Sequence, residues 1–312
     1  MSDLSPELHG ELSSQVIYSL LAYPGGILAG TGGGLLRSTD QAQTWQDALR
    51  ALDLQEPVAI LCLAQQSQMV FAGAVGGVLI TPDFGDSWAM VLLPTPPASV
   101  SALVVSPSFL QDGIVVAGTL EGGVYLSQNG GEHWKAWNFG LEDYHVLALA
   151  ISPGFGTDHC LYAGTETGLF RSQNGGRSWQ AVKLPCGFDA ILSLAISPDF
   201  IRDQTLLAGS ENHGLWLSTD GGQDWVRVAE EMVAEPVNSL VFAPAAGQMK
   251  VLAVTGSGVW RSQAPYSAWA NCLPEAYVGR EPVTVCPLVA DDGSFTIAAA
   301  FADGSIEIIP IS

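Results

Sequence analysis

The chain has 312 residues, of which 48% are hydrophobic and 13% charged, so it is rich in core-forming residues and extensive disorder is excluded. Its 31 acidic side chains outnumber 11 Lys and Arg, and the net charge of −20 argues against binding to nucleic acid or an anionic membrane surface. No window holds the roughly 18 apolar residues of a membrane-spanning helix. The acidity leaves two interpretations open: solubility alone, or a protein partner with a basic surface.

The N-terminal residues, MSDLSPELHGELSSQ, have neither the basic start nor the apolar centre of a secretory signal. We therefore expect a cytoplasmic protein. The same segment is a candidate strand, for a reason that follows from the repeat.

An alternating apolar segment, such as VLALAISPG at 146–154, occurs seven times along the chain, the first copy beginning at residue 16. A second segment follows each copy, as in LYAGTETGLFRS at 161–172. There, Ala-Gly-Thr breaks the apolar run and a glycine restarts it. This pattern predicts two strands joined by a tight glycine turn.

An eight-residue phrase ending in tryptophan closes six of these units. Its clearest copies are SQNGGEHW (127–134), SQNGGRSW (172–179) and STDGGQDW (218–225), and looser copies occupy 38–45, 81–88 and 262–269. The final tryptophans lie 43, 46, 45, 46 and 44 residues apart, and this regularity indicates a repeat architecture. A short fourth strand, such as WQAVKL, follows the phrase.

Four short antiparallel strands in about 45 residues predict one blade of a β-propeller. The period-two alternation and the 35 glycines argue against helical repeats. We therefore expect an all-β fold, a seven-bladed β-propeller of four-stranded antiparallel blades in a single domain. The blades are expected at about 16–50, 58–94, 100–139, 146–184, 191–230, 237–273 and 283–312.

The seventh unit supplies three strands and ends in SIEIIPIS without a tryptophan phrase. Because an open blade would leave an unpaired edge, residues 4–14 are expected to add its fourth strand and close the ring. Six blades with a stray tail are the alternative.

The tryptophan phrases resemble the Asp-box, or bacterial neuraminidase repeat, whose pattern is Ser-x-Asp-x-Gly-x-Thr-Trp. The resemblance covers residues 38–269 and implies that each phrase forms the hairpin between the third and fourth strands of a blade. Ser, Asp and Asn side chains can bond the backbone N–H groups of their own turn, and the tryptophan can pack against neighbouring strands. The expected structural residues are Ser38, Asp40, Trp45, Asp83, Trp88, Ser127, Asn129, Trp134, Ser172, Asn174, Trp179, Ser218, Asp220, Trp225, Ser262 and Trp269.

Two boxes depart from this pattern, and we expect their turns to be distorted. Ala42 stands at the glycine position of the first box, and Ala264 and Tyr266 replace Asp and Gly in the last. Calcium binding or acid catalysis is an alternative role for the box carboxylates. Asn129 and Asn174 replace the aspartate in two of the best copies, a change that a catalytic acid would not survive.

A second recurrent phrase, SPSFLQD, SPGFGTD or SPDFIRD, joins the first and second strands in three blades, from residues 106, 152 and 197. Its phenylalanines, Phe109, Phe155 and Phe200, are expected to fill the space beneath the hairpin. Its final aspartates are expected to cap a turn.

Recognisable chemical motifs are absent from the sequence. Sialidases share the Asp-box, but their Arg-Ile-Pro signature is missing here, and Arg37, Arg171 and Arg261 each precede a box serine instead of converging by design. The five histidines follow no metal-binding or Ser–His–Asp pattern. We therefore expect no catalytic residue, cofactor or metal ligand.

The five cysteines form no CxxC pair, and their odd number predicts neither a disulfide framework nor a zinc site. Cys62, Cys160 and Cys286 lie in apolar runs and are expected to be buried. Cys186 and Cys272 fall in loops and could be reactive.

In a propeller, the turns between the second and third strands share a face with the blade-to-blade loops. In blades three to five, these turns and loops combine acidic and aromatic residues, which indicates an interface for a basic, partly apolar protein. Ordinary solvated loops are the alternative. The candidate partner-binding residues are Glu121, Glu166, Glu211, Trp137, Phe139 and Tyr144, with Asp143 in the same loop.

These observations favour a non-catalytic scaffold or protein-interaction module, acting as a subunit or assembly factor of a larger complex. The alternative is a glycan-acting, sialidase-like hydrolase or a carbohydrate-binding propeller. A third hypothesis follows from resemblance to the photosystem II assembly propellers, which share such boxes. Those proteins carry a leader and act outside the cytoplasm, unlike the location expected here.

Overall fold

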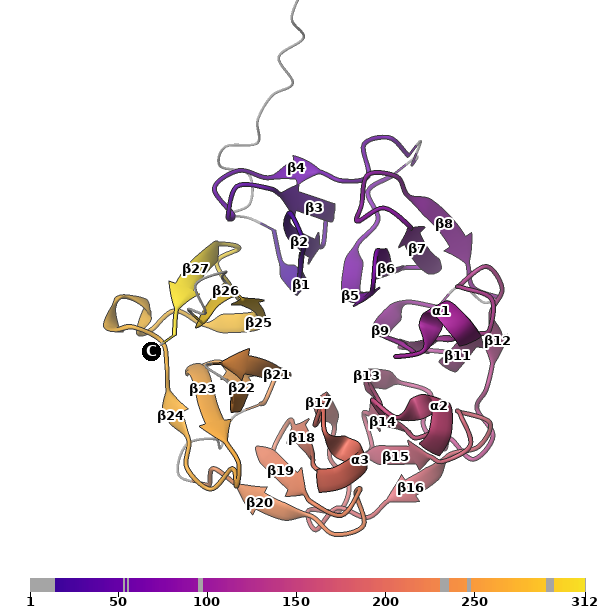
Figure 1. The fold of residues 1–312 in the computed structure, drawn as a ribbon, viewed down its shortest axis with the longest axis vertical. Coiled ribbons are helices and arrows are strands. Elements are labelled where there is room, and N and C mark those ends of the chain that lie inside the picture. Colours follow the sequence, from indigo (N-terminus) through magenta and orange to yellow (C-terminus); the bar gives the residue numbers. More distant parts are fainter. Residues whose placement is uncertain are drawn as a thin grey trace, which may run out of the picture.

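Seven sheets surround a central axis like the blades of a propeller (Figure 1). This computed structural model describes residues 15–52, 54, 56–94, 98–230, 236–245, 248–289 and 295–311. Within these residues, six sheets have four strands and the seventh has three. The predicted all-β, seven-bladed propeller of four-stranded antiparallel blades is confirmed.

The strands run outward from the axis in chain order within each blade. Blade one contains β1 (Ile17–Tyr23), β2 (Gly26–Thr31), β3 (Gly34–Ser38) and β4 (Gln46–Asp47), and blade two contains β5 (Ile60–Gln66), β6 (Met69–Ala74), β7 (Gly77–Thr81) and β8 (Ala89–Leu92). Blade three contains β9 (Val100–Val105), β10 (Val115–Thr119), β11 (Gly123–Ser127) and β12 (Lys135–Ala136), and blade four contains β13 (Val146–Ile151), β14 (Leu161–Thr165), β15 (Leu169–Ser172) and β16 (Gln180–Val182). Blade five contains β17 (Ile191–Ile196), β18 (Leu206–Ser210), β19 (Leu215–Ser218) and β20 (Val226–Val228), and blade six contains β21 (Ser239–Ala245), β22 (Gln248–Thr255), β23 (Gly258–Gln263) and β24 (Ala270–Asn271). Blade seven contains β25 (Pro282–Val289), β26 (Phe295–Phe301) and β27 (Ile306–Pro310).

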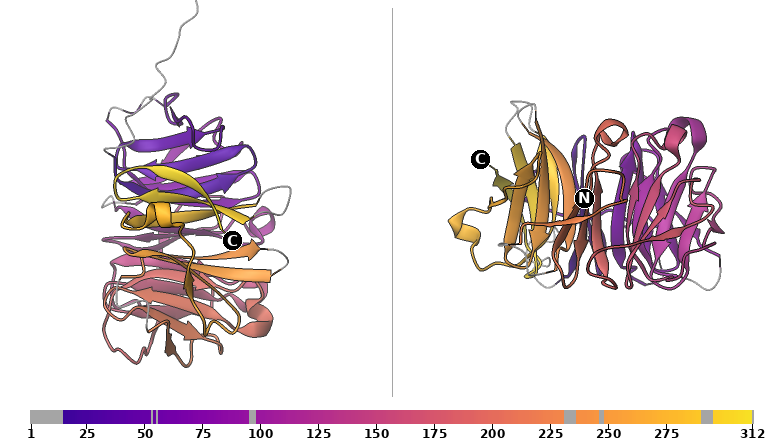
Figure 2. Two further views of the ribbon diagram at one scale, coloured as in Figure 1. Left: turned by 90° about the vertical axis from the view of Figure 1, so that its left-hand side faces the viewer. Right: turned by 90° about the horizontal axis from the view of Figure 1, so that it is seen from below.

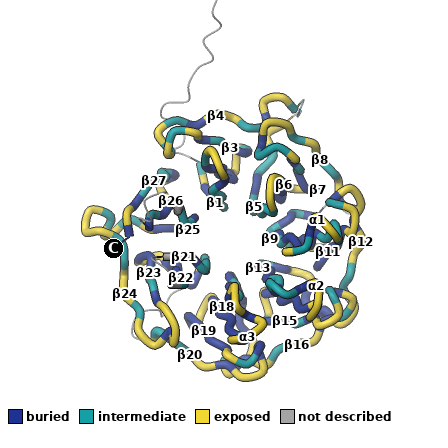
Figure 3. Tube along the Cα trace, viewed as in Figure 1, coloured by how far each residue is buried: buried dark blue, intermediate teal, exposed yellow. Residues whose placement is uncertain are grey.

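The core lies between the blades, where the apolar faces of adjacent sheets meet (Figure 3). One cluster, for example, joins Val124 of blade three to Val146, Phe170 and Trp179 of blade four. Alternating side chains of each strand supply the two faces of a sheet, so every blade except its rim is covered on both sides. Each blade is therefore stable only with its neighbours.

The ring is closed by apolar packing between its first and last blades. Ile27 and Trp45 of blade one share a cluster with Cys286 and Ala298 of blade seven. The Ala22 N–H also donates to Cys286 Sγ at 2.9 Å. The predicted closing strand at 4–14 lies outside the described residues and stays a prediction.

The Ala-Gly-Thr motif has a packing role that the sequence pattern did not indicate. The motif ends the second strand of a blade, as in β14, and a glycine turn leads from it into β15, so the predicted pair of strands joined by a glycine turn is present. A Cβ atom at Gly164 would lie 2.6 Å from the Ile191 carbonyl oxygen of the next blade. The glycine thus allows the first strand of the following blade to approach closely.

The second phrase forms one turn of helix, which was not predicted, in α1 (Phe109–Asp112), α2 (Phe155–Asp158) and α3 (Phe200–Asp203). A four-residue helix is too short to produce a helical period in the sequence. Its phenylalanine is buried in each case, as expected. In α2, Asp158 accepts hydrogen bonds from Ser152 Oγ (2.5 Å) and from the Cys160 N–H (2.9 Å), which ties both ends of the phrase together. A short 3-10 helix, η2 (Glu275–Tyr277), lies between β24 and β25.

The disc has two different faces. The short helices α1 to α3 lie on one face, which we call the box face (Figure 2). There the tryptophan phrases contact the helices: the Gly175 N–H donates to the His159 carbonyl at 2.9 Å. On the other, the connection face, turns between second and third strands meet the blade-to-blade loops. There the Glu211 N–H donates to the Ala190 carbonyl at 2.9 Å. None of the helices within the described residues has the length and hydropathy needed to cross a bilayer.

Candidate functional site

The tryptophan phrases use their polar side chains to hold the turn itself. In blade four, Ser172 Oγ accepts from the Gly176 N–H (2.9 Å) and donates to Asn174 Oδ1 (3.0 Å). Asn174 Oδ1 also accepts from the Ser178 N–H (2.9 Å). Asp220 makes the equivalent bonds in blade five, to the N–H groups of Gln223 and Asp224.

The box carboxylates have low pKa values. Hydrogen bonds from the Thr44 side chain and backbone lower the pKa of Asp40 to about 2. For Asp83, burial raises the pKa, but bonds from Ser87 and Thr81 outweigh it and bring the value to about 2. A proton donor at neutral pH needs a raised pKa, so these carboxylates suit a structural role better than acid catalysis.

The two atypical boxes differ from each other. In the first, the Ala42 N–H still donates to Ser38 Oγ and the Thr44 N–H to Asp40 Oδ1, both at 2.9 Å, so the expected distortion is wrong there. Ala42 takes the glycine conformation, with φ of 65°. In the sixth box, Ser262 Oγ instead donates to the Ala268 carbonyl at 2.7 Å, and the turn does depart from the pattern.

The box tryptophans link blades at the rim. Trp45, Trp134, Trp179 and Trp225 are buried, whereas Trp88 and Trp269 are partly exposed. Trp179 Nε1 donates to the Trp137 carbonyl of blade three at 2.8 Å. Trp225 Nε1 donates within its own box, to the Gly222 carbonyl at 3.2 Å.

The structure brings together four of the six candidate partner-binding residues. Glu121, Glu166 and Glu211 are exposed on the connection face. Tyr144 lies next to the turn that carries Glu121: its carbonyl accepts from the Gly123 N–H at 3.0 Å, and its side chain is 46% exposed. This part of the connection face therefore is acidic and carries an exposed aromatic ring.

The other two candidates lie elsewhere. Trp137 packs beneath Arg177 of the blade-four box, with the guanidinium carbon 6.0 Å from the ring centroid. Phe139 is exposed, but its carbonyl accepts from the Trp179 N–H at 2.9 Å, which places it at the rim. Sequence reasoning grouped both with the connection face because they share a loop with Tyr144; that grouping was incorrect.

Sequence reasoning missed the exposed aromatic ring of Phe188. Phe188, in the loop between blades four and five, is 91% exposed and directly precedes Asp189. Its position in a blade-to-blade loop, like that of Tyr144, was the signal that could have identified it. The two rings each adjoin a buried aspartate, Asp143 or Asp189.

These two aspartates connect the loops to the turns. Asp143 accepts from the Thr167 N–H (2.9 Å) and Thr167 Oγ1 (2.8 Å), and from the His145 N–H (3.0 Å). Burial raises its pKa, but the bonds from His145 and Thr167 outweigh burial and the net shift is downward. Asp143 is only 8% exposed, so it supports the face instead of meeting a partner directly.

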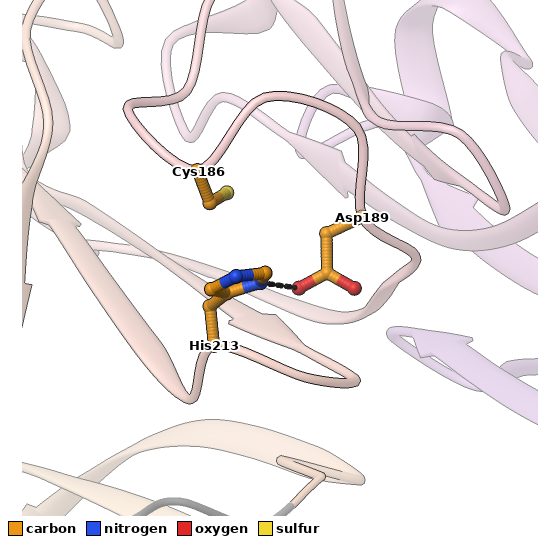
Figure 4. Close-up of side chains that lie close together, drawn as sticks. All are labelled: Cys186, Asp189 and His213. Carbon is orange, nitrogen blue, oxygen red and sulfur yellow. Dashed lines mark hydrogen bonds and ion pairs between the residues drawn. The ribbon is translucent and has the colours of Figure 1, made fainter.

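In blade five, the aspartate is part of a mixed cluster. Asp189 Oδ2 lies 2.7 Å from His213 Nδ1, and its Oδ1 accepts from Asn212 Nδ2 at 2.8 Å. Cys186 comes from the same loop and points toward the other two side chains (Figure 4). Sequence reasoning missed this cluster because the three residues match no metal or catalytic spacing.

The loop cysteines are not activated nucleophiles. Burial raises the pKa of Cys272 to about 11, and its Sγ donates to the Val259 carbonyl at 3.1 Å. Burial, followed by the charge of Asp189, also raises the pKa of Cys186. A reactive thiol needs a lowered pKa, so the hypothesis of reactive loop thiols is not supported at either position.

A pocket of about 490 Å³ opens on the box face between blades five and six, with Asp199 and Asp203 in its lining. Both oxygens of Asp203 are engaged, by Ser197 Oγ (2.6 Å) and the Thr205 N–H (2.9 Å). Asp199 Oδ1 lies 3.6 Å from Arg202 Nη1. A glycosidase needs one carboxyl group to donate a proton and the other to act as base or nucleophile, and Asp203 is poorly placed to do either.

Solved structures share this fold. The chain aligns with YCF48 bound to D1 peptide at a TM-score of 0.69 and 17% identity, covering 96% of this chain and 92% of that one. An ancestral GH74 enzyme aligns at a TM-score of 0.73 and 17% identity, and the alignment covers 94% of this chain and 44% of the enzyme. The extracellular domain of BT4673 from B. thetaiotaomicron aligns at a TM-score of 0.70 and 16% identity, and the alignment covers 95% of this chain and 38% of that chain. The chain thus spans less than half of the latter two.

At these identities the comparisons establish the seven-bladed propeller fold alone. No protein-family model matches the sequence. No curated protein matches it either.

Proposed function

We propose that this protein is a non-catalytic propeller that binds a protein partner through its connection face, as a subunit or assembly factor of a larger complex. The observation that carries the proposal is the combination of exposed rings, Tyr144 and Phe188, with the carboxylates of Glu121, Glu166 and Glu211 on that face. The rigid frame behind them is a ring of interlocked blades.

The energetics favour a partner that is apolar at the centre and basic around it. An exposed phenylalanine can bury apolar area at an interface, where aromatic residues often contribute most of the binding energy. The surrounding carboxylates would accelerate association with a basic surface and disfavour acidic proteins. A cytoplasmic location is part of this proposal, and fractionation of the native host tests it.

The YCF48 complex with D1 peptide supports the proposal by showing that a propeller of similar shape can hold a polypeptide. The GH74 likeness covers less than half of the enzyme and supports a catalytic role less well.

The test compares two pairs of exposed hydrophobic residues. Tyr144→Ala with Phe188→Ala alters the connection face, and Leu110→Ala with Ile201→Ala alters helices α1 and α3 on the box face. Leu110 and Ile201 are 79% and 64% exposed, so they are matched controls. A stoichiometric partner purified from the native host should bind the first variant about tenfold or more weakly and the second as tightly as the wild type.

Loss of binding only in the box-face variant would move the interface to the other side of the disc. Turnover of sialosides or aryl-glycosides by the wild type, abolished by Asp199→Asn, would replace the proposal with a glycan-acting enzyme.

A further inference from the structure

The loop between blades four and five and a turn of blade five bring three different metal-ligand types together. Cys186 and Asp189 come from the loop, and His213 from the turn between β18 and β19 (Figure 4). Their sulfur, oxygen and nitrogen ligand atoms lie within 4.8 Å of one another. We propose that they bind one Zn²⁺ ion, leaving a fourth position open to water or a partner's ligand.

The separations suit a single ion after small side-chain rotations. With bonds of about 2.0–2.3 Å, ligand atoms of a tetrahedral zinc site lie about 3.3–3.7 Å apart. The Asp189–His213 pair is closer, at 2.7 Å between Oδ2 and Nδ1, because a hydrogen bond joins these atoms. Zinc accepts thiolate, imidazole and carboxylate ligands, whereas magnesium and calcium prefer oxygen alone.

Asp189 is the anchor of this site. Its side chain is fully buried, and its other oxygen is held by Asn212 Nδ2 at 2.8 Å, an outer-shell bond of the kind that orients metal ligands. Among the described residues, its closest partners are an imidazole and an amide. A bound cation would offset the cost of the buried charge.

Coordination requires a defined proton balance. The Cys186 thiol loses its proton to solvent as the S–Zn bond forms, since the thiolate is the ligand. The imidazole binds as a neutral ligand, through whichever ring nitrogen does not carry its proton. One proton is therefore released for each ion bound when His213 starts neutral.

The alternative use of these residues is a Cys–His–Asp nucleophile. That chemistry needs the thiol to be hydrogen-bonded to its base. The Cys186 thiol instead donates to the Gly187 carbonyl at 3.9 Å, and His213 Nδ1 is paired with Asp189. This arrangement lacks the thiol–imidazole bond of a nucleophile and leaves the three ligand atoms facing a shared space.

The site would stiffen one segment of the connection face. The loop carries Phe188, and the turn carries Glu211 next to Asn212. An ion shared by loop and turn would hold these exposed groups at a constant separation. This consequence is independent of whether the face binds a protein.

The test uses the full chain, reduced and stripped of metal with a chelator, and titrated with Zn²⁺ against a chromophoric competitor. We expect one ion per chain and a higher melting temperature. Replacement with Co²⁺ should produce the thiolate-to-cobalt charge-transfer band. Cys186→Ser and His213→Gln should each weaken binding about tenfold or more, and Cys186→Ser should abolish the band.

His145→Gln and Cys272→Ser are the controls, because they remove the same residue types from blade four and from another loop; both should bind like the wild type. Circular dichroism establishes that every variant is folded. Absence of binding in the wild type, or equal affinity in folded Cys186→Ser, would overturn the proposal. A band that survives Cys186→Ser and disappears in Cys272→Ser would place the metal elsewhere.

Discussion

In blades four and five, a buried aspartate of the preceding blade-to-blade loop bonds the turn between the second and third strands, but the partner residues differ. In blade four, Asp143 accepts two bonds from Thr167 of the turn, and His145 lies in the same loop as the aspartate. In blade five, Asp189 meets Asn212 and His213, so the histidine has moved to the turn, and Cys186 completes a cluster. One architecture therefore produces a structural link in one blade and a candidate metal site in the next.

The comparison shows that the repeated frame does not determine the chemistry of its loops. The packing of the sheets requires only that the blade-to-blade loop be bonded to the turn between the second and third strands. Which side chains make the attachment is left free, and a change of two or three residues converts the link into a ligand set.

The largest expected difference concerns the box tryptophans of the same two blades. Trp179→Ala should cost on the order of 3–5 kcal/mol of unfolding free energy, because it removes a buried ring from the cluster shared with blade three. Trp225→Ala should cost about 1 kcal/mol less, since its indole bond is longer, at 3.2 Å compared with 2.8 Å for Trp179, and stays within its own box. Denaturant titration measures both. Equal losses would contradict a role of the Trp179–Trp137 bond between blades.

A smaller effect is expected at the two buried aspartates. Asp143→Ala should cost about 1.5–3 kcal/mol without metal, because backbone N–H groups of His145 and Thr167 lose an ionised acceptor. Asp189→Ala should cost less, since the backbone bond that Asp189 accepts from the Asn212 N–H is long, at 3.3 Å, and the Asn212 and His213 side chains can turn toward water.

The pH dependence of stability distinguishes bonds to an ionised aspartate from packing of its side chain. Both carboxylates have lowered pKa values when folded, so their contribution is present above the unfolded pKa of about 4 and is lost as the pH falls through the folded value. The gap in unfolding free energy between wild type and variants should therefore be constant near neutral pH and shrink as the pH falls below about 4. Asp199→Ala, at an exposed site, is the control and should show little gap at any pH. A gap that persists in acid would point to packing.

The smallest effect is expected in the box turns. Asn174→Ala and Asp220→Ala should each cost below about 1 kcal/mol, because both turns are exposed. Of these two turns, only the Asp220 turn should respond to acid: hydrogen bonds outweigh the burial of Asp220 and lower its pKa, so its contribution falls as the carboxylate is protonated. Asp220→Asn should remove that part of the pH dependence, as measured by thermal unfolding. An unchanged acid profile would mean that the Asp220 charge contributes nothing to the turn.

The propeller could be predicted because its signals are local and repeated. Strand alternation, turn glycines and regularly spaced tryptophans each depend on residues within one blade, and seven copies reinforce one another. The same locality explains the errors. Trp137 and Tyr144 share one loop in the sequence, but that loop starts at the rim directly after β12, so Trp137 lies against the box of the next blade.

The sequence by itself determined the number of blades, the strand order and the polar turns, because hydrogen bonds and side-chain alternation within 45 residues specify them. Only the tertiary structure decided which glycine admits the neighbouring blade and which loop residues meet. Gly164 contacts Ile191 across a blade boundary, and Cys186 reaches His213 across a complete hairpin. Such contacts depend on the twist of the sheets and the closure of the ring, and neither has a signature in the spacing of residues along the chain.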